Sequence, residues 1–194
     1  ADLPPLETAG LPPEVLPTPG SSVPPVDRAP LGDGTTLTLV PRPAEEPWSL
    51  QDIYQVNLPS IVSVRGSHQG GYSLGSGVIM TSNGYIITNS HVIEGCSRLD
   101  VVLWDDRTYP AALVGQDGQT DLAVLKISCT GLTPAEFGDS ADLEVGDMAV
   151  AIGNPLGDQL RGTMTDGIIS AINRNVNVEG RTMTLIQTNA ALNS

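Results

Sequence analysis

The sequence predicts an all-β fold, a barrel or a sandwich of short strands. Short apolar runs recur after residue 47, and turn signals such as Ser82-Asn83-Gly84 and Val178-Glu179-Gly180 lie between them. Many short strands at this spacing are typical of all-β domains. Aromatic residues make up only 4% of the chain, so we expect a core built from Val, Ile, Leu and Ala.

One short helix and nine strands are expected in the second part of the chain. The helix begins after Ser49, which can cap it, has Asp52 three residues later in the manner of a capping box, and ends at Pro59. The expected strands are, in chain order, Ile61–Arg65, Gly77–Thr81, Tyr85–Thr88, Leu99–Trp104, Tyr109–Gly115, Asp121–Ile127, Met148–Gly153, Gly167–Ile172 and Thr184–Thr188.

Residues 1–47 differ from the rest of the chain in composition. They hold 12 of the 16 prolines, and pairs such as Pro12-Pro13 and Pro24-Pro25 favour extended backbone. We interpret this stretch as a disordered, acidic, proline-rich linker or stalk, with a proline-rich ligand for a partner domain as the alternative. The globular domain is expected to span residues 48–194.

The charge of the chain excludes one class of partner. Lys and Arg number 9 against 22 Asp and Glu, which gives a formal net charge of −13. Nucleic-acid binding needs clustered basic residues, so no nucleic-acid partner is expected. No apolar run reaches the roughly 18 residues of a transmembrane helix. The chain starts on Ala1 without a signal peptide, and we expect that a segment has been lost before it.

The two histidines of the chain, His68 and His91, differ in context. His68 stands in a Gly-rich stretch and is interpreted as a solvated loop residue. His91 follows an apolar strand and precedes a tight turn, where it can face a cleft, and Asp121 begins another apolar strand, where a carboxylate needs a partner. Taken singly, each residue has a structural alternative: His91 can be a packed structural histidine, and Asp121 can be a simple turn residue. Together they can act as general base and orienting acid, because an Asp that accepts the imidazole N–H fixes its tautomer.

Five stretches of the chain resemble the HtrA/Deg family of trypsin-like serine proteases, in the family's order and spacing. They are GSGVIMTSNGYIITNSHVIEG (75–95), TDLAVLKI (120–127), GDSADLEVGDMAVAIGNPLG (138–157), GTMTDGIISAINR (162–174) and LIQTNAALNS (185–194). The resemblance implies two six-stranded Greek-key β-barrels with the active site between them. The first barrel, about residues 60–135, would carry His91 and Asp121, and the second, about residues 143–194, would be partial.

The last residues of the chain, IQTNAALNS, raise the question of what this turn presents. In the family it continues into a Gly-Asn-Ser-Gly-Gly run, which supplies the nucleophile and the oxyanion hole. The resemblance places that serine three positions beyond Ser194, so we expect a chain truncated before its nucleophile and its PDZ domain, and inactive by itself. Leu192 aligns with a family position that lines the substrate pocket, and a core leucine at the barrel rim is the alternative.

The resemblance also implies partners and a location. The parent protein would be a serine endopeptidase that degrades unfolded or misfolded proteins in the extracytoplasmic cell envelope. It would be membrane-anchored upstream of the stalk and assembled as a homotrimer. No cofactor is expected. Cys96 and Cys129 lack metal-ligand spacing, and in an exported protein they would form a disulfide, with two separate thiols as the alternative. The other function left open is a catalytically dead protease-like domain that acts only by binding peptides or proteins.

Overall fold

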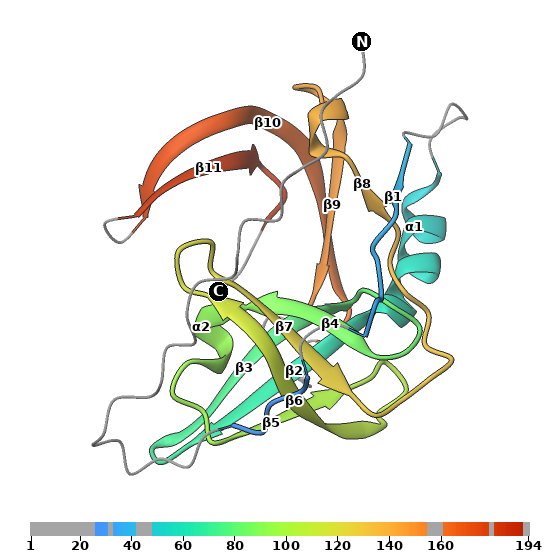
Figure 1. Ribbon diagram of the computed structural model, residues 1–194. Coiled ribbons are helices and arrows are strands. Elements are labelled where there is room, and N and C mark those ends of the chain that lie inside the picture. Colours follow the sequence, from blue (N-terminus) through green and yellow to red (C-terminus); the bar gives the residue numbers. More distant parts are fainter. Residues whose placement is uncertain (1–25, 31–32, 42–47, 155–160, 179–180, 192–194) are drawn as a thin grey trace.

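The computed structural model describes residues 26–30, 33–41, 48–154, 161–178 and 181–191, and these residues confirm the all-β prediction. A closed barrel forms one part of the molecule, and a curved three-stranded sheet stands beside it (Figure 1). All nine predicted strands are present, several of them longer than expected. The resemblance to a trypsin-like fold therefore agrees with the architecture.

The first barrel closes because each of its strands pairs with two neighbours, in the order β2-β3-β4-β7-β6-β5. All the pairings are antiparallel, and none leaves a free edge around the barrel. Its strands are β2 (Ile61–His68), β3 (Gly71–Ile79), β4 (Tyr85–Asn89), β5 (Arg98–Val102), β6 (Thr108–Asp117) and β7 (Leu122–Ile127).

The core lies inside this barrel and is aliphatic, as the low aromatic content predicts. Alternate residues of each strand point inward, which is the period-two pattern of a half-buried strand. The aliphatic residues with no exposed surface are Val62, Val64, Ile86, Val101, Leu125 and Ile127.

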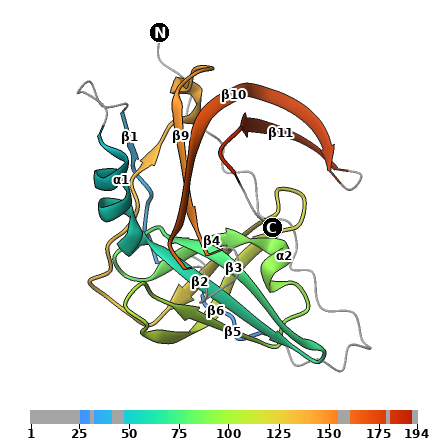
Figure 2. The same cartoon turned by 180° about the vertical axis from the view of Figure 1, so that it is seen from behind.

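The second sheet has the order β11-β10-β9, all antiparallel. Its strands are β9 (Met148–Gly153), β10 (Thr163–Val178) and β11 (Arg181–Thr188). Two register shifts around Ala171 bend the β10–β11 hairpin, and Figure 2 shows β10 arching from the first barrel over the top of the molecule. Within the described residues, β9 and β11 each pair on one side only.

Short helices lie between some of the strands. Ser49 caps α1 (Leu50–Asn57) as predicted, because its hydroxyl accepts the Asp52 N–H at 3.2 Å. The 3₁₀ turn η1 (Leu58–Ser60) follows it, so α1 ends before Pro59. The remaining helices are α2 (Ser90–Ile93), which carries His91, and the 3₁₀ turn η2 (Ser140–Asp142).

Two stretches of the expected stalk pair with strands from later parts of the chain. Residues 26–30 run parallel to β6, with Ala29 N–H donating to Leu113 O at 3.0 Å and Leu113 N–H donating to Asp27 O at 2.8 Å. Further on, β1 (Leu39–Val40) pairs with β8 (Phe137–Gly138). Composition alone did not predict these contacts, because the partner edges belong to distant segments. The expected boundary at residue 47 lies outside the described residues.

Candidate active site

His91 is presented by the junction of β4 and α2. The strand is held between β3 and β7, and buried Ile86 fixes it in the core. The chain turns at Asn89, the N-cap of α2, and His91 is the second residue of that one-turn helix. Its side chain is 67% exposed, so the ring stands at the rim of the barrel as the sequence predicts.

Asp121 lies in the turn directly before β7, because the strand begins at Leu122, one residue later than predicted. Its φ of 56° is in the left-handed region, which Asp tolerates better than most residues. Strand pairing puts Asn89 opposite Leu122, and the Ser90 N–H donates to the Asp121 carbonyl at 3.0 Å. The pairing of β4 with β7 therefore brings together two residues that are 30 positions apart.

The Asp121 carboxylate accepts two hydrogen bonds from His91. The backbone N–H of His91 donates to Oδ1 at 2.9 Å, and the ring Nδ1 lies 2.7 Å from Oδ2. Because a carboxylate only accepts, this contact places the ring proton on Nδ1 and leaves Nε2 as an acceptor. An imidazole held in this way can take a proton from a nucleophile and later return it.

Electrostatics favour an ionised Asp121. Partial burial by itself raises the pKa of this carboxyl, but the hydrogen bonds from the backbone and the ring of His91 outweigh that effect, with a further contribution from Asn89. The pKa therefore lies below its ordinary value of 3.8. At neutral pH the carboxylate is charged and can stabilise a protonated imidazole beside it.

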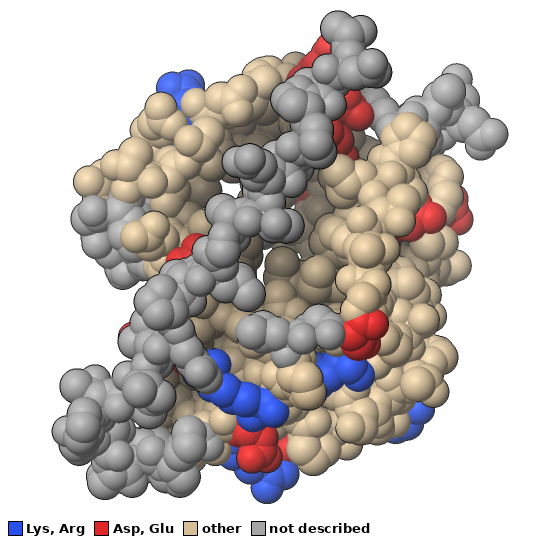
Figure 3. Space-filling view, viewed as in Figure 1, with Lys and Arg blue, Asp and Glu red and all other residues tan. Residues whose placement is uncertain are grey.

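A cleft of about 480 Å³ lies between the first barrel and the second sheet, and His91 is one of its lining residues. The hollow between the β10–β11 hairpin and the first barrel is visible in Figure 3, where Lys and Arg lie mostly over the barrel and next to Asp and Glu. One wall comes from β3, the β4–α2 junction and α2, and the other from β9, β10 and the turn after β11. Its lining residues include Leu74, Ser76, Asn89, His91, Thr165 and Ala191.

The turn after β11 is held against β10 by hydrogen bonds. This turn leads to the last residues of the chain, where the sequence left open what the turn presents. Asn189 Oδ1 accepts the N–H of Ile168 at 2.7 Å, and Ala191 O accepts the Thr165 hydroxyl at 2.7 Å. A Cβ on Gly167 would overlap Asn189, so only glycine allows this approach. The turn thus runs along the cleft wall that faces His91. Leu192 lies outside the described residues.

A buried polar contact joins the two walls below the cleft. The backbone N–H of Asn154 donates to Ser76 Oγ at 2.8 Å, and Asn154 Oδ1 accepts the Gly162 N–H at 2.8 Å. The Asn154 side chain is 1% exposed. Beside it, Arg161 donates to the carbonyl of Leu103 at 3.2 Å in the first barrel. These contacts fix the second sheet against the wall that carries His91.

The remaining candidate residues lie apart from the cleft. Cys96 is buried beside Ser73, whereas Cys129 is half-buried near Tyr109. Both are free thiols, so the disulfide interpretation is wrong for this structure and the alternative of two separate thiols holds. Each thiol packs against a different part of the barrel, which explains why they do not meet. His68 ends β2, is exposed, and accepts the Gly70 N–H through Nδ1 at 3.3 Å.

The described ranges were also searched for metal-binding clusters and for membrane-spanning helices. Within them, no group of three or more His, Cys, Asp and Glu residues is arranged to hold a metal ion. In the same ranges, no helix has the length and apolar character needed to cross a membrane.

Comparison with known proteins decides the family. Residues 75–194 match the trypsin-like peptidase domain, which is more than half of the chain. The chain belongs to the trypsin-like peptidase family. This stretch contains both His91 and Asp121, so the whole pair lies inside the matched domain. The resemblance to the HtrA/Deg branch is also confirmed by the relatives that follow.

Several trypsin-like peptidases of the HtrA type are similar to the chain. It is 49% identical to the serine protease Do-like HtrB of Bacillus subtilis over 61% of its own length and 28% of that relative. It is 46% identical to a probable periplasmic serine endoprotease, DegP-like, of Chlamydia pneumoniae over 61% of the chain and 24% of the relative. The chain thus spans about a quarter of the curated relatives it matches.

Solved structures of trypsin-like peptidases superpose on the chain as well. The HtrA-type protease AlgW with a tripeptide matches with a TM-score of 0.70 and 41% identity, over 75% of this chain and 47% of that one. The serine endoprotease from Yersinia pestis matches with a TM-score of 0.66 and 39% identity, over 77% of this chain and 51% of that one. At these identities the likeness extends from fold to family.

One residue of the site, Asn89, was not predicted from the sequence. Its side chain reaches Asp121, and the residue lines the cleft. The available signal was a polar residue at the end of an apolar strand, two positions before His91. That signal has no chemical meaning until the pairing of β4 with β7 is known.

Proposed function

We propose that the chain is the part of a serine endopeptidase that carries the general base, His91, and its orienting acid, Asp121. One observation carries the proposal: a 2.7 Å contact between His91 Nδ1 and Asp121 Oδ2 at the edge of a cleft between two β-units. In the described part of the chain no serine hydroxyl bonds to the ring. The nucleophile would come from the turn that continues after Ala191.

The proposed reaction is acyl transfer from a peptide bond. His91 Nε2 takes the proton of the attacking serine hydroxyl, and the resulting imidazolium is stabilised by the ionised Asp121. The same nitrogen then gives its proton to the leaving amine as the peptide C–N bond breaks. Water hydrolyses the acyl-enzyme by the reverse roles. The substrate would lie along the cleft, whose far wall is formed by Thr165 and the turn at Ala191.

The experiment measures peptide hydrolysis by the protein extended through its nucleophile turn, with casein as the substrate. His91→Ala should lower kcat by about a millionfold and Asp121→Asn by about ten-thousandfold, because triad members act as a unit. His68→Ala is the matched control, since this exposed histidine lies outside the cleft, and should leave kcat unchanged. Equal activity of wild type and His91→Ala would refute the proposal.

We extend the proposal to the parent protein's role as an extracytoplasmic enzyme of protein quality control. Relatives named as periplasmic serine endoproteases support this location and role. The parent would act on unfolded or misfolded proteins, be membrane-anchored upstream of residue 1, and assemble as a homotrimer. Faster cleavage of a reduced, unfolded protein than of its native form, without ATP, would support the role. Equal cleavage rates would count against it.

Peptide binding without hydrolysis is the second candidate, and the free side of β11 favours it. Within the described residues this strand pairs only with β10, so an extended peptide could add to its outer edge. Reading the coding sequence past Ser194 separates the two functions. A Gly-Asn-Ser-Gly-Gly continuation supports the endopeptidase, whereas a stop codon leaves binding as the only role.

A further inference from the structure

Asn89 occupies the N-cap position of α2 but does not cap it. Asn is among the residues preferred at N-caps because its side chain can accept a backbone N–H of the first turn. Here the side chain makes no such bond, although the backbone has the extended conformation of a cap, with φ −81° and ψ 144°. A residue well suited to capping therefore uses its amide elsewhere.

The amide of Asn89 is directed at Asp121. Its Nδ2 lies 3.2 Å from the Asp121 carbonyl oxygen and 3.2 Å from Oδ2. Oδ2 is the same oxygen that accepts the ring of His91. One amide thus bonds to both the main chain and the side chain of the acid.

Asp121 needs such support. Its backbone is in the left-handed region, which costs free energy and persists only where neighbours hold it. The carboxylate can rotate about its Cβ–Cγ bond unless hydrogen bonds fix it. The backbone N–H of His91 donates to Oδ1. Oδ2 has two donors, the ring of His91 and the amide of Asn89. The ring itself is mostly exposed and is therefore a weak restraint.

We propose that Asn89 is a positioning residue of the catalytic pair, which fixes the Asp121 carboxylate so that Oδ2 faces the ring of His91. This inference rests on the function proposed above. Asn89 acts through Asp121 and has no part in proton transfer. It also ties the turn at Asp121 to the end of β4, so the acid and the base move as one unit.

The test uses ¹⁵N and ¹³C NMR of the chain at a pH where imidazole is neutral. The wild-type His91 ring is expected to carry its proton on Nδ1. Asn89→Ala, which removes the donor, should shift a substantial fraction of the ring to the Nε2–H tautomer. It should also raise the titration midpoint of the Asp121 carboxyl, because the Asn89 amide is one of the donors that lower its pKa. Asn83→Ala is the matched control, because Asn83 lies in the turn between β3 and β4 and donates to the carboxylate of Asp33, and should change neither signal.

A second variant guards against a folding defect. Asn89→Asp keeps the size of the side chain but cannot donate from a charged oxygen, and should alter the tautomer in the same direction. Its own charge raises the Asp121 midpoint by repulsion, so only the tautomer is compared for this variant. If both variants keep the Nδ1–H tautomer and Asn89→Ala keeps the wild-type midpoint, Asn89 is not a positioning residue. Loss of thermal stability with unchanged NMR signals overturns the proposal too, because that result indicates a structural role alone.

Activity gives the third readout, in the protein that carries the serine. Asn89→Ala should lower kcat about tenfold and leave KM unchanged, because the amide supports the acid and not the substrate. A rise in KM at constant kcat would contradict the inference. The proposed function fails separately, if wild-type His91 shows the Nε2–H tautomer or if His91→Ala retains full activity.

Discussion

The first barrel and the second sheet are built from similar strands but differ in closure. The barrel buries the side chains of Val62, Val64 and Leu125 completely, whereas β9 has no buried residue. In the second sheet Ile168, Leu185 and Ile186 are each more than a third exposed. A sheet that closes on itself removes its edges and encloses its own core, whereas a three-stranded sheet covers only what it packs against.

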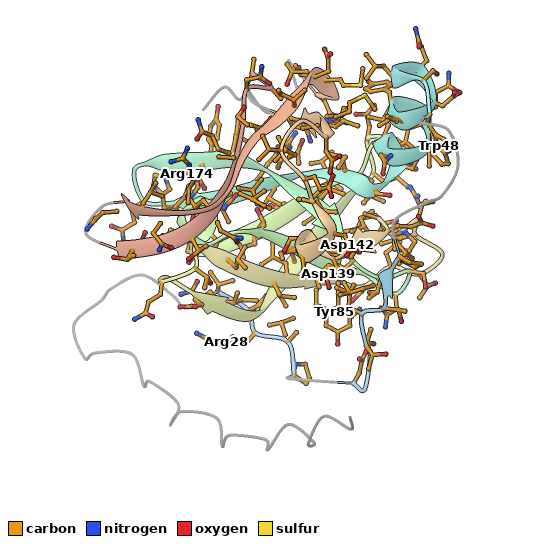
Figure 4. All side chains as sticks on the ribbon, turned by 90° about the horizontal axis from the view of Figure 1, so that it is seen from above. Arg28, Trp48, Tyr85, Asp139, Asp142 and Arg174 are labelled. Carbon is orange, nitrogen blue, oxygen red and sulfur yellow. The ribbon has the colours of Figure 1, made fainter. Side chains whose placement is uncertain are left out.

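This difference explains where the site chemistry lies. His91 and Asp121 both belong to the closed barrel, so their geometry is fixed by strand pairing within one core. The open sheet supplies only the opposite wall of the cleft. In Figure 4 Trp48, beside α1, and Arg174, on the hairpin of the open sheet, lie at opposite ends of the molecule. The hairpin extends well beyond the contacts that hold it to the barrel.

The sharpest test of this comparison truncates one aliphatic side chain in each region. Leu125→Ala should destabilise the domain by about 2–5 kcal/mol, since it opens a cavity in a closed core. Ile186→Ala should cost less than about 1 kcal/mol, because that side chain is 45% exposed. Urea unfolding followed by circular dichroism measures both. Similar losses from the two substitutions would show that the regions are equally packed.

The contact between the regions can be broken at Ser76 and weakened at Asn154. Ser76→Ala removes the acceptor of the Asn154 backbone N–H, which is the hydrogen bond between the regions. Asn154→Ala keeps that backbone donor but leaves the Gly162 N–H without its acceptor and should cost about 1–3 kcal/mol, and the double variant tests coupling. In hydrogen exchange, the amides of β9 and β10 should lose protection before those of β4 and β7. Uniform loss across both regions would mean that they unfold as one unit.

The N-terminal stretch against β6 is expected to contribute less. Deleting residues 1–30 removes the two backbone bonds with Leu113 and should destabilise the barrel by about 1–2 kcal/mol. Deleting residues 1–25 keeps both bonds and is the control. Thermal melts of the two truncated chains compare them. Identical melting temperatures would show that residues 26–30 add nothing to stability.

The smallest effect concerns acid pH. Asp121 and Asp117 both have a pKa below the ordinary 3.8, the latter because the Gln119 N–H and the Thr120 hydroxyl donate to it. A lowered pKa means that the stabilisation is complete above pH 3.8 and is lost as pH falls through the folded-state value. Asp121→Asn should therefore flatten the dependence of unfolding free energy on pH below 3.8. An unchanged slope there would rule out this contribution.

Much of the site could be predicted from the sequence, and the limits have physical causes. His91 and Asp121 were proposed as a pair because one follows and the other starts an apolar strand, and because both lie in stretches that resemble the HtrA/Deg family. The cap at Ser49 was predicted because capping is local. Three features were not predicted, since each depends on a partner far away in the chain. They are the role of Asn89, the backbone hydrogen bonds of residues 26–30 to Leu113, and the hydrogen bond of Asn154 to Ser76.

The sequence by itself therefore determined the strand pattern and the aliphatic core, and it proposed His91 and Asp121 as base and acid. Alternation of apolar residues and capping chemistry act over a few positions, and the linear chain contains them in full. Only the tertiary structure decided that His91 and Asp121 lie within hydrogen-bond distance and that the cysteines stay apart. Barrel closure sets those distances, because it fixes which strands become neighbours.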